Sequence, residues 1–491
     1  MKVNSLTIVG GGTAGFITAL TLKKRLPISI TMVIPSRIGI IGVGEGSTEH
    51  FQDFREHLGI PAETFLKETC GTLKSGIMFK DWNSDHPLYL HHIQSQWQQM
   101  LGLSHRNYEY LMSSKRESIA FVPKCFFENK LEPDLGTTGD LVQYHFNTFK
   151  LNEYLTKLAK EAGIKIVDDE ITKVNIDKKI TSIEGKKQKY QSDFYIDCTG
   201  FRKILIGQLG AKWVSYSPWL KTNSAIAFPT EDQDEYNIWT LSKAMKAGWM
   251  WQIPTYGRTG NGYVFDKNYI SKDEAVKEVE ELLGRKIQVA KHIEYDPGRL
   301  DKVWIENCVA VGLSANFVEP LEATSIGTTI QQSFLLMQYL EDYTPTSINT
   351  YNKHIEIIMN NIKDFIQLHY ITDKEDSPFW KDVKKVKPSK TLQQMLDVWK
   401  QGKLLKSTDL ELIGSYSWFS LFKEANFNLI AYFNNLIDLK KLKENYEYIN
   451  KKLDDYWFEK NIENGIILRN KTELIRKMSH KEYIKNLHVK N

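Results

Sequence analysis

The amino-acid sequence predicts an α/β fold that opens with a strand–helix–strand unit and closes with a helical region. Three observations lead to this prediction. A buried strand at 5–9 passes through a glycine-rich turn into a helix that runs to about Arg25. Short alternating strands with turns between them follow at 163–201, which is typical of a β-meander. From about Val386 onward, apolar residues recur at helical spacing.

The first element is the stretch "SLTIVGGGTAGFITALTLKKRL", which fits G-x-G-x-x-G between a strand and a helix. Glycines in this pattern permit a tight turn and let the backbone approach a pyrophosphate, which lies at the helix N-terminus. The turn is therefore predicted to bind a dinucleotide. The predicted contacts are Gly10, Gly12, Thr13, Ala14 and Gly15.

The second strand, "ISITMVI" at 28–34, should be followed by an acid that binds the ribose. Ile34, Pro35 and Ser36 occupy that place, so the Ser36 hydroxyl is the candidate ribose ligand. The missing acid argues against a nicotinamide dinucleotide as the bound cofactor more strongly than it argues against FAD.

Three later segments suit a cofactor crevice: the glycine-rich strap "IGVGEGST", the strand end "DCTGF" and the strand "VWIENCVAVGL". Strand ends of this kind line the ligand crevice of an open α/β sheet. The predicted cofactor contacts there are Gly42, Val43, Gly44, Glu45, Asp197, Gly200 and Gly312, with Ile326 in the following helix. This order of elements resembles the flavoprotein monooxygenase fold over roughly residues 1–335. The resemblance implies a Rossmann-type unit, a β-meander and a substrate-side sheet, with FAD as cofactor.

Further motifs resemble those of the flavin-dependent halogenases, the group that includes the tryptophan halogenases. The matching segments are "GVGEGST", "GTLKSG" with Lys74, "QYHFNTF", "GWMWQIP", "NFVEPLEATSIG" and "HYITDKEDSPFW", in the family's order. The resemblance implies that Trp249 and Trp251, on one face of a strand, keep the organic substrate away from the flavin. It also implies that reduced FAD and oxygen convert halide to hypohalous acid, which travels to Lys74 and halogenates an aromatic ring. No segment resembles a flavin reductase, so reduced FAD is expected from a separate protein.

The halide is expected at Thr324 and Ser325, where a helix begins and free N–H groups can bind an anion. An ordinary N-cap by Thr324 is compatible with this role. Two positions depart from the family's P-L-E-S-T-G: Ala323 replaces Ser and Ser325 replaces Gly. We therefore expect an altered halide preference, towards bromide or iodide.

Two roles for Lys74 are open, a haloamine that needs the neutral amine or an ammonium that donates a hydrogen bond to hypohalous acid. An ordinary lysine is neutral only about 0.04% of the time at pH 7, and a nearby carboxylate favours the charged form. The charged donor is therefore preferred. Glu322 is expected to orient the oxidant or to take up positive charge from the ring.

The substrate pocket is less well defined. "HPLYLHH" with His86 and "SYSWFSLF" with Trp418 are its candidate segments. A phenol, an indole or a carrier-bound acyl ring remain open as substrates. The predicted domains are a core at 1–385, with insertions at about 76–135 and 212–300, and a helical subdomain at 386–491 that covers the substrate side.

Composition excludes several classes. A net charge of +4 over 491 residues gives no case for nucleic acid as a partner. No apolar run approaches a membrane span, and the short N-terminal run leads into the glycine turn rather than a signal-cleavage site. Four scattered cysteines indicate neither a metal site nor disulfides, so a cytoplasmic protein without metal is expected. Homo-oligomerisation is left open.

Two alternatives compete with a halogenase. A flavin monooxygenase without halide chemistry accounts for the cofactor motifs but leaves Lys74 and the tryptophan pair unexplained. A flavin-bearing sensor that has lost turnover predicts an exposed Lys74, unconnected to the flavin.

Overall fold

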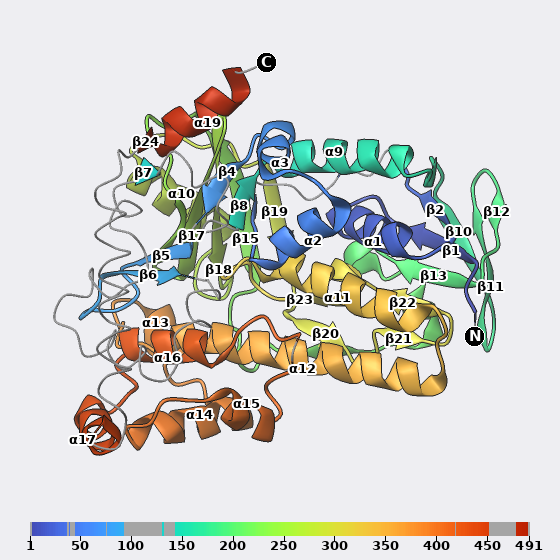
Figure 1. The fold of residues 1–491 in the computed structure, drawn as a ribbon. Helices are drawn as coiled ribbons and strands as arrows, with labels where there is room; N and C mark the ends of the chain where they lie inside the picture. The colour runs from blue at the N-terminus through green and yellow to red at the C-terminus, as the bar shows by residue number, and fades with distance from the viewer. Residues whose placement is uncertain are drawn as a thin grey trace.

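A computed structural model describes residues 2–36, 39, 45–74, 76–92, 130–131, 143–417, 419–450 and 478–489. The predicted α/β fold is confirmed: a six-stranded, mostly parallel sheet forms the centre of the amino-terminal part (Figure 1). Its strands, in spatial order, are β21 (Trp304–Ile305), β22 (Cys308–Ala310), β13 (Phe194–Asp197), β1 (Ser5–Val9), β2 (Ser29–Val33) and β9 (Lys165–Val167). Only β21 runs antiparallel to its neighbour. Strands covered on both faces are expected to be almost continuously apolar, as β1 and β13 are.

A group of helices packs against this sheet. The helix that follows the glycine turn, α1 (Thr13–Arg25), ends where the sequence predicts, before Pro27. It lies among α9 (Thr148–Glu161), α2 (His50–Leu58) and α11 (Thr324–Leu340). The longest helix, α12 (Pro345–Tyr370), starts at a capping box formed by Thr344 and Ser347 and runs beside α11. The predicted meander is present as β10 (Ile171–Asp177), β11 (Lys179–Gly185) and β12 (Lys189–Tyr190).

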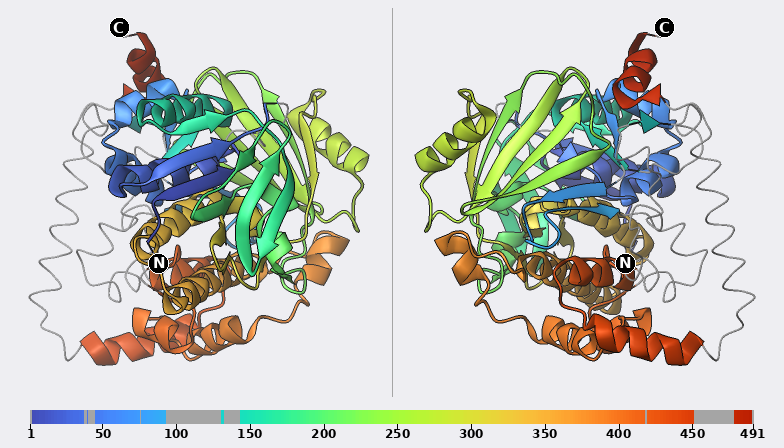
Figure 2. Two further views of the ribbon diagram at one scale, coloured as in Figure 1. Left: turned by 90° about the vertical axis from the view of Figure 1, so that its right-hand side faces the viewer. Right: turned by 90° about the vertical axis from the view of Figure 1, so that its left-hand side faces the viewer.

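A second, seven-stranded sheet stands beside the first, and Figure 2 shows it from both sides. Its strands, in spatial order, are β19 (Lys291–Glu294), β15 (Ser224–Thr230), β18 (Arg258–Phe265), β17 (Gly248–Thr255), β16 (Trp239–Met245), β5 (Gly76–Lys80) and β6 (Leu88–His92). The helix α10 (Lys272–Leu283) packs on β18. All neighbours are antiparallel except β16 and β5. This is the substrate-side sheet that the sequence predicts.

Small sheets connect the two large ones. One consists of β3 (Glu45–Gly46), β8 (Gln143–Phe146) and β4 (Thr72–Lys74). Another consists of β14 (Trp213–Ser215), β20 (Gly298–Leu300) and β23 (Asn316–Phe317). Lys74 ends β4, in the first of these small sheets, and Glu322 lies in the segment after β23, in the second.

The carboxyl-terminal part is helical, as predicted. Its helices are α13 (Pro378–Val383), α14 (Lys390–Lys400), α15 (Ser407–Leu412), α16 (Glu424–Phe433) and α17 (Leu439–Asn450). The last segment leaves this group: β24 (Met478–Ser479) pairs with β7 (Lys130–Leu131), and α19 (His480–Val489) packs on α3 (Ala62–Glu68), at the far end of the molecule from α14 and α17 (Figure 1).

In the described ranges, none of the helices combines the length and the apolar character needed to cross a membrane.

Candidate active site

Lys74 ends β4 and is completely buried. Its Nζ donates a hydrogen bond to the Ser47 carbonyl at 2.6 Å, and a Cβ placed on Gly46 would lie 3.3 Å from the same nitrogen. The amine of Lys74 therefore lies directly against the end of the glycine-rich strap at 41–48. Burial lowers the pKa of Lys74 to about 8, although the charges of Glu322 and Glu49 act to raise it. The alternative of a sensor protein predicts an exposed Lys74, and the buried position of the side chain contradicts it.

A histidine from the carboxyl-terminal segment supports the strand that carries Lys74. The Leu73 N–H, next to Lys74 in β4, donates to Nε2 of His480 at 3.1 Å. The other ring nitrogen, Nδ1, donates to the Tyr236 carbonyl at 3.0 Å. Burial lowers the pKa of His480 to about 4, so the imidazole stays neutral and keeps one acceptor and one donor.

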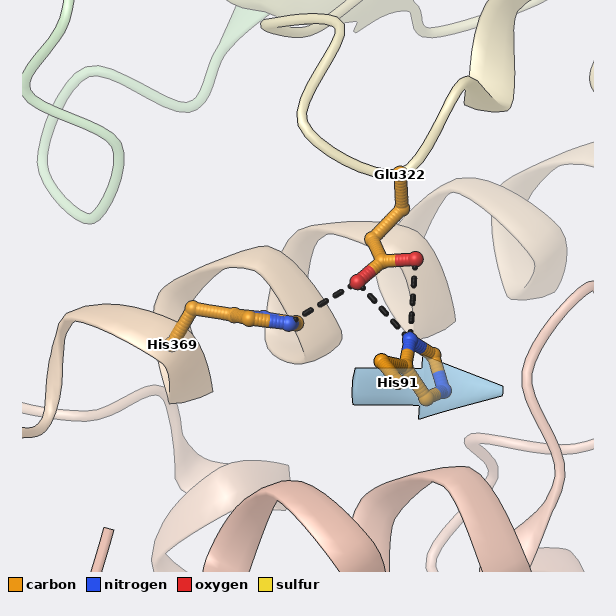
Figure 3. Close-up of side chains that lie close together, drawn as sticks. All are labelled: His91, Glu322 and His369. Atoms are coloured by element: carbon orange, nitrogen blue, oxygen red, sulfur yellow. Dashed lines mark hydrogen bonds and ion pairs between the residues drawn. The ribbon is translucent and has the colours of Figure 1, made fainter. Parts of the chain in front are cut away.

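Glu322 lies in the segment between β23 and α11 and is also completely buried. Two histidines contact its carboxylate from opposite sides (Figure 3). Nδ1 of His91, on β6, lies 2.9 Å from Oε1 and 3.0 Å from Oε2. Nε2 of His369, in the last turn of α12, lies 3.0 Å from Oε1.

Hydrogen bonding assigns the protons of this His–Glu–His cluster. A carboxylate only accepts, so Nδ1 of His91 carries a proton, and Nε2 of His91 accepts from the Asn426 amide at 3.2 Å. Nδ1 of His369 donates to the Phe365 carbonyl at 2.8 Å. Nε2 of His369 also faces the carboxylate, so the two rings hold Glu322 between them.

The electrostatics of Glu322 follow from these two neighbours. Burial acts to raise the pKa of the carboxyl, but His91 and His369 outweigh it and lower the pKa to about 2. Glu322 is thus an anion at any pH at which the protein functions, and it is a weak base. The three side chains could also hold a metal ion, since their ligand atoms lie within 4.8 Å of one another.

The two tryptophans of β17 lie side by side on one face of the seven-stranded sheet, as the alternation predicts. Their ring centroids are 6.0 Å apart, and both rings are buried. Trp251 fits against Gly262, where a Cβ would lie 2.1 Å from its ring. Strand β17 continues one residue past Pro254, to a part where it pairs only with β18, so the proline removes no ladder hydrogen bond.

Glu319 fixes the position of Trp249. Its carboxyl group accepts hydrogen bonds from Trp249 Nε1 at 3.0 Å, from the Tyr370 hydroxyl at 2.7 Å and from the Thr222 hydroxyl. Glu319 precedes Glu322 by three residues, and Tyr370 follows His369. The tryptophan pair and the His–Glu–His cluster are therefore held by the same two segments.

The turn before α1 has the shape that a pyrophosphate requires. Gly10, with φ +120°, has no room for a Cβ, which would lie 2.1 Å from the Cys198 carbonyl oxygen. Gly15 packs equally tightly, on the carbonyl of Gly10. A Cβ on Gly12 would meet nothing within 4 Å, and α1 has no side-chain cap, so its first N–H groups, at Thr13 and Ala14, face open space. These residues fit a dinucleotide phosphate.

Other predicted cofactor contacts have different surroundings. Gly200 follows β13 with open space around it, and Gly312 follows β22 against Ala14. The Asp197 carboxylate accepts hydrogen bonds from Thr199, from the backbone N–H groups of Leu205 and Ile206, and from the Ser314 hydroxyl, so it shapes its own turn. Glu45, on β3, is partly buried, and the loss of solvent raises its pKa to about 7. Ile326 is buried in the first turn of α11. Gly42, Val43 and Gly44 lie outside the described residues.

The predicted halide residues begin α11. Ala323 precedes them in the left-handed region, at φ +54°, and provides no side-chain cap. Thr324 is buried. The N–H groups of the first helical turn have no intrahelical acceptor, so an anion can bind there.

Of the predicted substrate residues, His86 stacks on Tyr432 with ring centroids 5.5 Å apart and also contacts Phe433. Trp418 lies outside the described residues. The sequence interpretation missed His91, which lies five residues beyond His86 and contacts Glu322. The alternation in "LYLHH" was the available signal, since it places Tyr89 and His91 on the same face of a strand.

Comparison with known proteins agrees with this geometry. A family model described as tryptophan halogenase matches residues 5–428. The tryptophan 6-halogenase SttH of Streptomyces toxytricini is 31% identical, over 81% of this chain and 84% of that protein. The tryptophan 7-halogenase RebH of Lentzea aerocolonigenes is 29% identical, over 82% of each.

Solved structures agree as well. The crystal structure of SttH superposes with a TM-score of 0.86 and 27% identity, over 98% of this chain and 99% of that one. Xcc4156, a flavin-dependent halogenase from Xanthomonas campestris, superposes with a TM-score of 0.85 and 26% identity, over 99% of each chain. The fold and these matches define an enzyme of the flavin-dependent halogenase class. The chain belongs to the tryptophan halogenase family, which confirms the resemblance seen in its motifs.

Proposed function

We propose that this enzyme uses reduced FAD, dioxygen and halide to halogenate an electron-rich aromatic ring of the indole or phenol type. The observation that carries the proposal is the position of Lys74. Its side chain is completely buried, its amine donates to the strap, and the charge of Glu322 acts to raise its pKa. Buried lysines are rare unless they are paired or have a function. The tryptophan 6- and 7-halogenases to which the chain is similar favour an indole.

When bound, reduced FAD supplies with dioxygen the oxidising power that turns halide into hypohalous acid. The N–H groups at the start of α1 hold its pyrophosphate, and those of Thr324 and Ser325 hold the halide. We propose that a separate flavin reductase provides the reduced FAD. Trp249, held by Glu319, and Trp251 exclude the organic ring from the flavin, so that only a small oxidant passes to Lys74.

At the far side, the Lys74 ammonium donates a hydrogen bond to hypohalous acid and makes its halogen more electrophilic. Glu322 cannot serve as an efficient base, because its pKa is about 2. Its fixed negative charge instead stabilises the positive charge that develops on the ring during electrophilic attack. The two histidines keep the carboxylate in place for this purpose.

One assay tests the function. Purified enzyme is supplied with reduced FAD from an unrelated reductase, with oxygen, with equal concentrations of chloride, bromide and iodide, and with a panel of indoles and phenols. We expect monohalogenated products by mass spectrometry, with bromide or iodide preferred to chloride because these halides need less oxidising power. A strict chloride preference would contradict the proposed effect of Ala323 and Ser325.

The same assay without halide separates the competing function. A flavin monooxygenase would give a hydroxylated ring whether or not halide is present. A halogenase gives no organic product without halide and only oxidises the flavin. Halide-independent hydroxylation would therefore replace the proposed function with the alternative.

The pH dependence of halogenation should report the charge of Lys74. With a pKa of about 8, the amine is roughly 10% neutral at pH 7 and largely neutral at pH 9. If the ammonium is the active form, halogenation falls as the pH rises through about 8, by about tenfold per unit above it. If a neutral amine forms a haloamine, the rate rises instead. Initial rates from pH 6 to 10 distinguish the two.

Two controls isolate this alkaline limb. The rate of flavin oxidation without aromatic substrate is measured over the same range and divided out. Glu322 contributes no inflection, because its pKa is about 2, whereas burial raises the pKa of Glu45 and of Glu49 to about 7. Changes of the halogenation rate below pH 7.5 are therefore assigned to Glu45 and Glu49. Only the change of rate above pH 7.5 is assigned to Lys74.

A further inference from the structure

The parallel sheet lacks an acid at the place where a dinucleotide-binding fold normally presents one to the ribose. Strand β2 ends at Val33 and is followed by Ile34, Pro35 and Ser36, none of which carries a charge. The ribose hydroxyl groups of a bound dinucleotide usually donate to a carboxylate at this point. An acceptor from another element would have to replace it.

The neighbouring strand places an acid there. Strand β9 pairs in parallel with β2, with Val167 opposite Val33. Parallel strands end at the same edge of a sheet, so the residues after them lie side by side. Asp168 follows β9 directly, and its Oδ1 accepts a hydrogen bond from the Ser36 backbone N–H at 2.8 Å. The carboxylate of Asp168 is therefore next to the backbone that would have carried the missing acid.

This edge is continuous with the glycine turn. The Gly10 N–H donates to the Val33 carbonyl at 3.0 Å, and the Ile34 N–H donates to the Val167 carbonyl at 2.9 Å. A Cβ added to Gly11 would lie 2.3 Å from Cγ2 of Ile34, so the Ile34 side chain packs directly on the glycine turn. The glycine turn is open at Gly12. It therefore lies along the same edge of the sheet as the Asp168 carboxylate.

Asp168 has the charge and the accessibility that a ligand would need. Its side chain is 56% exposed, and Oδ2 lies 3.2 Å from Nζ of Lys187, which is itself 61% exposed. The hydrogen bonds from Ser36 and Lys187 lower the pKa of Asp168, so the group is an anionic acceptor. The adjacent Asp169 differs, because it is buried and its two oxygens accept from the Tyr190 hydroxyl and from the backbone of 170, 187 and 188.

We infer that Asp168 replaces the missing acid of β2 and accepts hydrogen bonds from the ribose hydroxyl groups in the AMP half of FAD. The inference rests on the proposed use of FAD. It also changes the role expected of Ser36, whose backbone N–H and hydroxyl both hydrogen-bond the Asp168 carboxylate and so position it.

Binding measurements on the full chain test this without an activity readout. The affinities of FAD, ADP and an ADP analogue that lacks both ribose hydroxyl groups are measured by calorimetry. Four proteins are compared: the wild type, Asp168→Asn, Ser36→Ala and Lys187→Ala. Asp168→Asn keeps an oxygen acceptor for the Ser36 N–H and removes only the charge, so it separates ligand binding from support of the turn.

We expect Asp168→Asn to weaken FAD and ADP by about tenfold, in line with the strength of a charge-assisted hydrogen bond. The same variant should lose most of the preference for ADP over its dideoxy analogue. Ser36→Ala keeps the backbone N–H that holds Asp168 and should weaken FAD less than Asp168→Asn does, and Lys187→Ala should bind FAD no more weakly than the wild type. Equal FAD affinity in wild type and Asp168→Asn, or an unchanged preference for ADP, would overturn the inference alone. A wild type that binds no FAD would overturn the proposed function as well.

Discussion

Replacing Lys74 by alanine is expected to lower halogenation by about 10²–10³-fold, while reduced FAD is still oxidised. The loss should be this large because Lys74 is the only positive group in our proposal that polarises the oxidant, and a single preorganised donor contributes about 10²–10³ in rate. The flavin-side residues are untouched, since the amine hydrogen-bonds only the strap carbonyl of Ser47 in the described structure. Product is measured by mass spectrometry and flavin oxidation by absorbance.

Lys74→Met separates the charge from the packing. It keeps a long apolar stem in the buried site and should be as inactive as alanine, with a higher thermal unfolding midpoint because no cavity forms. Lys80→Ala is the matched control: Lys80 lies on the adjacent strand β5, is exposed, and should leave halogenation unchanged. Halogenation by Lys74→Met at a rate near that of the wild type would remove Lys74 from the mechanism.

Replacing Glu322 by glutamine is expected to lower the halogenation rate by about 10²–10³-fold. The amide has nearly the same shape but no charge, so it cannot stabilise the positive ring. The amide also presents N–H donors to one of the two histidine nitrogens, so a contact in the buried cluster is lost. A buried donor left without its acceptor costs about 1–3 kcal/mol. Both the rate and the free energy of unfolding should therefore fall.

Two comparisons make this prediction specific. Glu341→Gln, at the exposed far end of α11, should change neither quantity. The double variant Glu322→Gln with His369→Gln should regain part of the lost stability, because two amides can pair a donor with an acceptor, but none of the lost rate. If the double variant recovered halogenation, the carboxylate would be serving stability and not chemistry.

Much of the cofactor side could be predicted from sequence because its signals are local. The glycines before α1 and the turns of the meander act over a few residues, and they appear where expected. The two tryptophans of β17 are similar, since alternation alone places them on one face. Such patterns depend on backbone geometry and do not require knowledge of which elements meet.

The environment of Glu322 could not be predicted in this way. His91 reaches Glu322 only because β6 pairs with β5 in a register that sets Met78 opposite Leu90, and a shift by one residue would turn His91 away. His369 arrives from the end of a 26-residue helix, so its position depends on how α12 packs. A sequence pattern does not show which distant residues meet in the fold. The sequence therefore predicted a role for His86 and not for His91.

The hydrogen bond from Leu73 to His480 joins residues 407 positions apart. During synthesis, β4 is therefore made long before its partner leaves the ribosome. Until then the peptide group beside Lys74 has no acceptor from α19. The strand that carries Lys74 is therefore completed only after α19 has been synthesised.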